Sequence, residues 1–313
     1  MTAPSSPAAL AIRCRGLRKR YPDVLAVDGL DLEVRRGECF GLLGPNGAGK
    51  TTAIEILEGL TQPDEGEVEI LGRRWSEEPY EIRERIGVSL QETKLSDKLT
   101  VRETIALFRA LYASGRPPDE ILRQLSLEEK ANARVEKLSG GQKQRLAVAC
   151  ALVGDPEILF LDEPTTGLDP QSRLQLWGQI TRFRADGRTV LLTTHSMDEA
   201  ERLCDRIAIV DHGRMIALGT PSELIALIEA PQVIEFAADP MPAEESLGAI
   251  AGLRGVHSRG AALALHVDSL IESVPALLAH LERSRARLLE LSTHRATLED
   301  VFVTLTGRDL RET

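Results

Sequence analysis

The stretch "CFGLLGPNGAGKTTAIEIL", residues 39–57, decides the fold. It fits the pattern GxxxxGK[ST], with an apolar run before the loop and apolar residues at helical spacing after it. A buried strand that enters a helix through such a loop turns its backbone N–H groups toward phosphate, and the helix dipole adds positive potential. Lys50 is expected to reach the β and γ oxygens, and Thr51 is expected to bind Mg²⁺. The alternative is a glycine-rich turn with a structural role only. The glycines that let the backbone curl are Gly44, Gly47 and Gly49.

Polar side chains with catalytic chemistry follow three other apolar segments. Asp162 and Glu163 end "ILFLDEP", His195 follows "TVLLTT", and Gln91 follows "GVSL". Asp162 is expected to hold Mg²⁺ through its water shell, and Glu163, which points the other way along an alternating strand, suits a general base. An acidic turn and a surface histidine are the plain alternatives, and a glutamine at a loop start indicates little alone.

These segments alternate with helical patterns, which predicts an α/β fold with a parallel sheet wrapped in helices. Ligands of such a sheet bind beyond the carboxyl ends of its strands, where the acids and the histidine fall. Residues 101–137 are predicted to be helical with a break at "GRPP", and residues 206–219 to form a hairpin.

A second glycine-rich stretch, "LSGGQ", precedes a helical pattern far downstream of the first. Ser139 is a natural N-cap, and the N–H groups of Gly140, Gly141 and Gln142 are expected to be free donors that form an anion site. An ordinary capped helix is the alternative. Because the helical segment before it would carry this site away from the first loop, a homodimer in which each copy completes the other's site is predicted.

Composition excludes several classes of protein. The chain has 313 residues, 42% of them hydrophobic, and a net charge of −10, so it is predicted to be globular and not a general nucleic-acid binder. Four widely spaced cysteines offer no local zinc ribbon or redox pair and suggest a reducing compartment. The longest apolar stretch, residues 146–161, is interrupted by polar residues, so no membrane span is expected. The basic residues predicted to form the wet face of a strand are Arg13, Arg15, Arg18, Lys19 and Arg20.

The texture of the sequence changes around residues 225–232. We expect a disordered lead over 1–9, a large domain over 10–225, and a small α+β domain over 232–310. The sequence contains no internal repeat.

Together these motifs resemble the ATP-binding cassette (ABC) family, the nucleotide-hydrolysing subunits of ABC transporters. The resemblance covers about residues 10–225 and implies a P-loop NTPase cassette: a parallel-sheet core, an antiparallel β subdomain and a helical subdomain. It implies ATP and Mg²⁺ as ligands and a head-to-tail nucleotide sandwich of two cassettes. The matching motifs are an A-loop tyrosine at Tyr21; a Walker A loop of Gly44, Pro45, Asn46, Gly47, Ala48, Gly49, Lys50, Thr51 and Thr52; a Q-loop at Gln91; the signature Leu138 to Gln142; a Walker B strand with Asp162 and Glu163; a D-loop ending at Asp169; and a switch histidine at His195.

The segments "GVSLQETKLSDKLTVRETIALFRALY" and "TLEDVFVTLTGRDLRE" resemble the daunorubicin/doxorubicin-resistance group of ATP-binding subunits. That resemblance implies a separately encoded six-helix permease, a peripheral location on the cytoplasmic side of the membrane, and a multidrug or antibiotic type of cargo. The alternative is a soluble ABC ATPase that acts on ribosomes or nucleic acid, which the acidic balance disfavours. An importer subunit would predict a β-barrel type of extension.

Overall fold

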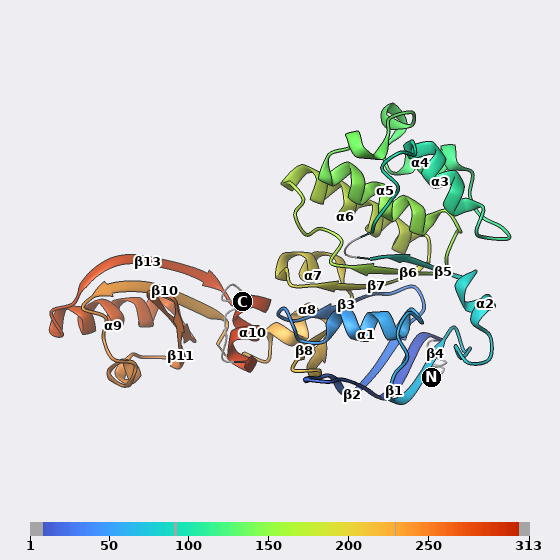
Figure 1. The fold of residues 1–313 in the computed structure, drawn as a ribbon. Coiled ribbons are helices and arrows are strands. Elements are labelled where there is room, and N and C mark those ends of the chain that lie inside the picture. The colour runs from blue at the N-terminus through green and yellow to red at the C-terminus, as the bar shows by residue number, and fades with distance from the viewer. Residues whose placement is uncertain (1–8, 91–92, 229, 307–313) are drawn as a thin grey trace, which may run out of the picture. The chain divides into compact units, whose positions relative to one another are not determined.

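The computed structural model describes residues 9–90, 93–228 and 230–306, which form two compact units that divide between Leu218 and Gly219 (Figure 1). The predicted end of the large domain, residue 225, therefore falls in the second unit, at the end of helix α8 (Pro221–Ile225). This short helix begins with its own capping box at Thr220 and packs against the last helix of the second unit. Local patterning could not show to which unit it belongs. Most of the predicted lead lies outside the described residues.

The first unit is built around a six-stranded sheet whose central strand precedes the P-loop. Four of its strand pairs are parallel, as the alternation of strands and helices predicts. The hairpin predicted over 206–219 is present at one edge. In sheet order the strands are β5 (Ile86–Ser89), β6 (Ile158–Asp162), β7 (Thr189–Thr194), β3 (Cys39–Leu43), β8 (Arg206–Asp211) and β9 (Arg214–Gly219).

A three-stranded antiparallel sheet forms the β subdomain, and its order is β2 (Val24–Arg35), β1 (Leu10–Tyr21), β4 (Glu65–Ile70). The basic residues of β1 lie on strand positions as predicted, and carboxylates of β2, β4 and nearby turns pair with them, for example Glu69 with Arg13 at 2.6 Å and Asp64 with Lys19 at 2.9 Å. The basic stretch is thus a solvated, ion-paired strand.

Helices surround the six-stranded sheet on both sides. Figure 1 shows α1 on the side of the β subdomain and α5 and α6 on the opposite side. The segment predicted to be helical over 101–137 contains two α-helices and two 3₁₀ turns. The helices of this unit are α1 (Lys50–Leu57), α2 (Pro79–Arg83), α3 (Val101–Arg109), α4 (Pro118–Gln124), η1 (Glu128–Lys130), η2 (Val135–Lys137), α5 (Gly140–Leu152), α6 (Pro170–Ala185) and α7 (Met197–Leu203).

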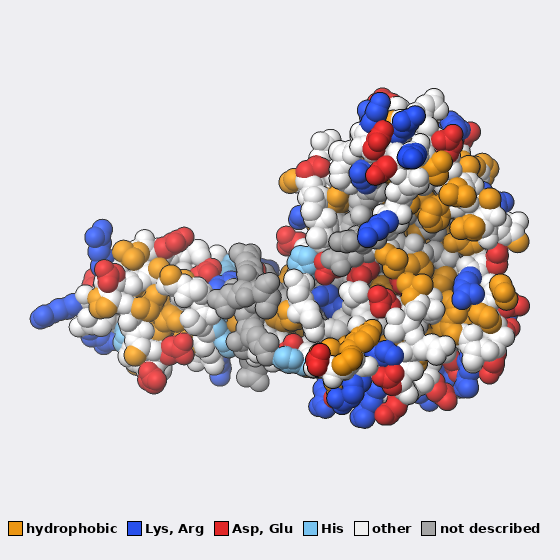
Figure 2. Space-filling model, in the orientation of Figure 1, with side chains coloured by type: hydrophobic (Ala, Val, Ile, Leu, Met, Phe, Trp, Pro, Cys, Tyr) orange, Lys and Arg blue, Asp and Glu red, His pale blue; other side chains and the backbone are white. Residues whose placement is uncertain are grey.

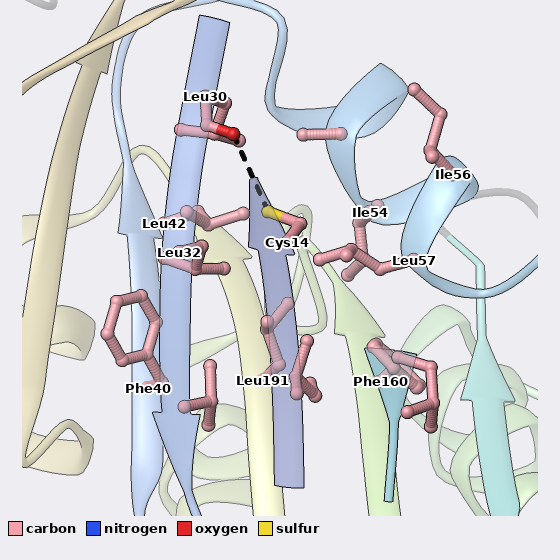
Figure 3. Close-up of a cluster of buried hydrophobic side chains, with 14 of the residues drawn as sticks. Cys14, Leu30, Leu32, Phe40, Leu42, Ile54, Ile56, Leu57, Phe160 and Leu191 are labelled. Atoms are coloured by element: carbon pink, nitrogen blue, oxygen red, sulfur yellow. Dashed lines mark hydrogen bonds between the residues drawn. The ribbon is translucent and has the colours of Figure 1, made fainter. Parts of the chain in front are cut away.

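Apolar side chains from both sheets and from α1 form the core beneath the P-loop (Figure 3). Leu42 and Phe160 come from the six-stranded sheet, Leu32 from the β subdomain and Ile54 from α1, and none is more than 2% exposed. Cys14 is buried among them and donates to the carbonyl of Leu30. This packing fixes α1, and with it the loop that precedes α1, on the sheet.

The second unit is a four-stranded antiparallel sheet with the order β11-β12-β10-β13. One face packs on α9 through an apolar core that includes Phe236 and Leu277, and Val233 and Ala264 on the other face pack near Ile228. The α+β texture agrees with the expectation for this part of the chain. Its remaining elements are β10 (Gln232–Asp239), η3 (Glu244–Ala249), β11 (Leu253–Arg259), β12 (Ala262–Val267), α9 (Leu270–Arg283), β13 (Arg287–Arg295) and α10 (Leu298–Thr306).

Candidate nucleotide site

The loop between β3 and α1 is shaped by three glycines, and two of them leave no room for a Cβ atom. A Cβ atom on Gly44 would lie 2.3 Å from the carbonyl oxygen of Val210, and one on Gly49 would lie 2.0 Å from that of Ala26. Gly49 also has a φ of 96°, and Gly47, which has open space around it, has a φ of 77°. The loop is therefore pressed against β2 and β8 and has the curled form that phosphate binding needs.

The start of α1 fits an anion. This helix has no acidic residue in its own first turn and no side chain that caps it, so its first N–H groups are not engaged by a side chain of that turn. Asn46 and Gly47 on the loop are exposed, Pro45 and Thr52 are half-buried, and the buried Ala48 accepts a hydrogen bond from the backbone of Gly213 at 2.9 Å. The backbone around the exposed part of the loop is open to a phosphate group.

Lys50 folds back onto the loop that precedes it. Its Nζ donates to the carbonyl oxygens of Gly44 at 2.8 Å and Pro45 at 3.0 Å, and lies 3.7 Å from Oε1 of Glu163. The side chain is 4% exposed, and burial lowers its pKa although Glu163 and Asp162 act in the opposite direction. A buried cation is thus held beside the loop, in a position from which it could contact phosphate oxygens.

Asp162 and Thr51 lie together, as the sequence predicts for residues that share a cation. Asp162 ends β6 and is 2% exposed, and its carboxylate accepts a hydrogen bond from the hydroxyl of Thr193. Burial raises the pKa of Asp162, while the hydroxyls of Thr193 and Thr51 act in the opposite direction. Within the described residues no group of three or more His, Cys, Asp or Glu side chains could hold a metal ion. A hydroxyl and one carboxylate suit Mg²⁺, which takes most of its ligands from phosphates and water.

Glu163 contacts both the P-loop lysine and the histidine that follows β7. Its Oε2 lies 3.2 Å from Nδ1 of His195 and accepts from the hydroxyl of Thr166 at 3.1 Å. These hydrogen bonds, first the one from His195, lower the pKa of Glu163, and the same contact raises the pKa of His195. An ionised carboxylate at this place could accept a proton from water.

The expected opposite direction of the two acids rests on strand alternation, which ends before Glu163. β6 ends at Asp162, and Glu163 has a φ of 45°, so the alternation does not continue through it. The Glu163 carboxylate reaches Lys50 from this turned position.

Ser139 caps α5 as predicted, and the cap uses one of the three expected donors. The N–H of Gln142 donates to Oγ of Ser139 at 3.3 Å, while Oε1 of Gln142 accepts from the N–H of Ser139 at 3.1 Å, which completes a capping box. Gly140 is exposed with open space around it, whereas a Cβ on Gly141 would lie 2.6 Å from Oγ of Ser172. Gly140 thus leaves the turn accessible, and Gly141 allows α5 to pack closely against Ser172 of α6.

The structure does not bring this signature turn onto its own P-loop. α5 and α1 lie on opposite sides of the six-stranded sheet (Figure 1). Asp169 lies instead beside the signature turn: it caps α6 by accepting from the N–H of Ser172 at 3.0 Å, and its Oδ2 is 3.7 Å from a Cβ built on Gly141. Gln91, predicted to orient water and metal, lies outside the described residues.

Tyr21 stands at the end of β1, where it pairs with Val24 across the turn into β2. It is 38% exposed, and Ala26, whose carbonyl presses on Gly49, lies two residues beyond Val24. The tip of this hairpin is therefore near the P-loop, where an exposed aromatic ring could stack on a base. The sequence patterns assigned no role to Thr166 and Thr193, whose hydroxyls donate to Glu163 and Asp162 in the structure.

The comparisons with known proteins agree with this geometry. Residues 27–166 match the family model described as ABC transporter. The chain is 43% identical over 304 residues to "Nod factor export ATP-binding protein I" of Ralstonia nicotianae, with 95% of this chain and 94% of that protein covered. It is 44% identical over 301 residues to the protein of the same name in Burkholderia pseudomallei strain 1710b, with coverage of 94% and 96%.

Among solved structures, an ATP-binding subunit of an ABC transporter superposes with a TM-score of 0.64 at 30% identity, over 70% of this chain and 93% of that one. The ATP-binding cassette MJ0796, described as a dimer in a post-hydrolysis state with ADP and Pi, superposes with a TM-score of 0.62 at 28% identity, over 67% and 98%. The P-loop cassette fold is thereby confirmed. The chain belongs to the ATP-binding subunits of ABC transporters, which are ATPases coupled to transport and bind ATP with Mg²⁺.

Proposed function

We propose that this chain hydrolyses ATP to energise an ABC exporter, and that two copies close head to tail around the nucleotides. The observation that carries the proposal is the cluster of Lys50, Asp162, Glu163 and His195 beside the P-loop. Relatives that match almost the whole chain are named for Nod factor export, which supports export as the direction. Their names do not support the drug cargo that the subgroup resemblance implies.

Each residue of the cluster has a proposed task. Lys50 binds the β and γ phosphate oxygens, and Thr51 and Asp162, with Gln91, hold Mg²⁺. Mg²⁺ supplies positive charge that polarises the phosphates. Glu163 accepts the proton of the attacking water, and the imidazole of His195 keeps its carboxylate in place.

A second copy is the proposed partner of the signature turn. Ser139 and Gly140 are exposed, and Gly140 has open space around it, so this turn is accessible from outside the chain. The opposite placement of α5 and α1 supports a partner from another copy, and so does the dimeric state of MJ0796. Asp169, beside Gly141, would lie at the same contact.

The first unit is the proposed cassette and the second an accessory domain. None of the helices in residues 9–90, 93–228 and 230–306 combines the length and apolar content of a membrane crossing. Large apolar side chains are nevertheless exposed on and after α2 and α3, with Tyr80 at 77%, Leu107 at 52% and Leu111 at 69%. Figure 2 shows hydrophobic side chains gathered on this side of the first unit. They support docking to a six-helix permease on the cytoplasmic side of the membrane.

Membrane association distinguishes the exporter from a ribosome- or nucleic-acid-acting ATPase. After lysis and sedimentation, the exporter predicts that the chain pellets with membranes and co-purifies with a six-helix protein. Co-sedimentation with ribosomes, and none with membranes, would end the exporter proposal.

The variant Glu163→Gln tests the hydrolytic site directly. It should bind ATP as the unsubstituted chain does, hydrolyse it at least about 100-fold more slowly because no carboxylate takes the proton, and accumulate as a dimer. Phosphate release, nucleotide binding and light scattering after size exclusion measure the three quantities. Glu201→Gln, on the exposed face of α7, is the matched control and should stay within about twofold. Near-normal turnover of Glu163→Gln would show that another group is the base.

A further inference from the structure

Thr193 is hydrogen-bonded to the carboxylate of Asp162 and to the backbone of Glu163. It belongs to β7, where it is the register partner of Asp162 in the parallel pair β6–β7, and its side chain is 0% exposed. Register partners in neighbouring strands point to the same face of a sheet, so the hydroxyl and the Asp162 carboxylate must meet.

The hydroxyl has a fixed hydrogen-bond arrangement. Its proton goes to Oδ1 of Asp162, because an ionised carboxylate only accepts. One of its lone pairs accepts the N–H of Glu163 at 3.0 Å, and the same N–H reaches the carbonyl oxygen of Thr193 at 3.2 Å. A single residue is therefore hydrogen-bonded to the side chain of one acid and to the backbone of the next.

The two contacts of Thr193 restrain the carboxylate of Asp162 and the backbone of Glu163, which lie at the end of β6. Glu163 has a φ of 45°, which is unfavourable for a residue with a Cβ and persists only when its surroundings hold it. The bond to Oδ1 fixes the rotation of the Asp162 carboxylate and leaves Oδ2 as the oxygen without a bond from Thr193.

We propose that Thr193 is a positioning residue for ATP hydrolysis, whose hydroxyl orients the Asp162 carboxylate toward Mg²⁺ and holds the backbone that carries Glu163. This inference rests on the proposed function of the same site. The Thr193 hydroxyl is bonded to Asp162 and to the backbone of Glu163, and it acts through these two acids.

A second buried threonine of β7, Thr189, allows the proposed role of Thr193 to be distinguished from the general effect of removing a buried hydroxyl. Oγ1 of Thr189 accepts the N–H of Gly37 at 3.0 Å, at the other end of the strand and away from the acids. Thr189→Val therefore removes a buried threonine hydroxyl from the same strand without touching the site. It is the matched control for Thr193→Val, which keeps the shape of the side chain and removes the hydroxyl.

The experiment uses the full chain and three measurements: the Kd of a fluorescent ADP analogue with Mg²⁺ and with EDTA, the rate of ATP hydrolysis against Mg²⁺ concentration, and the midpoint of thermal unfolding. Thr193→Val should lose about 10- to 100-fold in kcat, the loss expected for a hydrogen bond to a charged group, and should need more Mg²⁺ for half-maximal rate. Its Kd with EDTA should stay within about twofold, and Thr193→Ser should recover most of the rate. Thr189→Val should show no change in Mg²⁺ dependence.

Several results would overturn the inference. One is a Thr193→Val enzyme with the rate and Mg²⁺ dependence of the unsubstituted chain. Another is a Thr193→Ser enzyme that is as impaired as Thr193→Val. A third is a Thr193→Val enzyme whose nucleotide binding is weakened equally with Mg²⁺ and with EDTA. If Thr193→Val does not fold, Thr193→Ser and Thr193→Ala, which differ only in the hydroxyl, replace it in the same comparison. Absence of hydrolysis by the unsubstituted chain would refute the proposed function instead, and the Mg²⁺-dependent Kd would still decide the role of Thr193.

Discussion

The carboxyl group of Glu58 is buried in the first unit, and the free-energy cost of burying it depends on pH. Glu58 follows α1, is 4% exposed, and neither of its carboxyl oxygens has a hydrogen-bond partner among the described residues. Burial, together with the nearby charges of Asp162 and Glu55, raises its pKa from 4.5 to about 8. The folded chain thus keeps a proton that the unfolded chain releases above pH 4.5. Stability must therefore fall as the pH rises from 4.5 to about 8.

Glu58→Gln removes this titration and keeps the shape of the side chain. A pKa difference of about 3.5, at about 1.4 kcal/mol for each unit, makes the variant more stable by up to about 5 kcal/mol above pH 8. About 3 kcal/mol of that gain is present at pH 7, and nearly none below pH 4.5. The neutral acid and the amide both leave polar atoms unpaired, so their desolvation costs largely cancel in the comparison.

Urea unfolding between pH 4.5 and pH 8.5, followed by tryptophan fluorescence, measures the difference. The chain has two tryptophans, Trp75 and Trp177, and both lie in the first unit, so the signal reports the unit that contains Glu58. Nε1 of Trp75 donates to the carbonyl of Leu57, next to Glu58. Glu201→Gln, on the exposed face of α7 and not among the charges that act on Glu58, is the control and should change stability by less than about 0.5 kcal/mol. A gain from Glu58→Gln that is the same at every pH would refute the reasoning, because it would come from packing and not from the proton.

Two further substitutions test the loops. Ser139→Arg should leave ATP binding to one chain largely intact, because Lys50 and its loop remain, but should abolish dimer closure and hydrolysis by adding bulk at the exposed signature turn; loss of ATP binding by the monomer would mean that both loops serve one nucleotide. Gly49→Ala should destabilise the first unit by more than about 2 kcal/mol and abolish nucleotide binding, because its Cβ would meet the carbonyl of Ala26 at a φ of 96°. Gly178→Ala, on the exposed face of α6, should instead stabilise by about 0.5–1 kcal/mol, and urea unfolding that ranks the two alike would contradict the steric argument.

The sequence predicted the parts of the site that depend on local patterns. The loop from Gly44 to Thr51 needs glycines at fixed spacing, and the cap at Ser139 needs only its own turn, so both could be read directly. The strand ends with Asp162 and His195 could be placed at one edge because parallel strands align their carboxyl ends.

What the sequence did not predict depends on register and on non-local packing. Thr193 lies opposite Asp162 only because β6 and β7 pair with that register, which no single stretch encodes. The direction of Glu163 depends on a positive φ that a strand pattern does not show, and the burial of Glu58 depends on how α1 packs on the sheet. The sheet order of the second unit, with β10 between β12 and β13, likewise requires contacts far apart in the chain.

The contacts that Lys50 makes without nucleotide contribute to the measured affinity of this chain for nucleotide. The ammonium group is already shared among the oxygens of Gly44, Pro45 and Glu163, so binding exchanges partners and does not add them to a vacant cation. The measured binding constant is then the difference between two sets of contacts. A relative whose loop holds its lysine less firmly would bind ATP more tightly without one additional contact to the nucleotide.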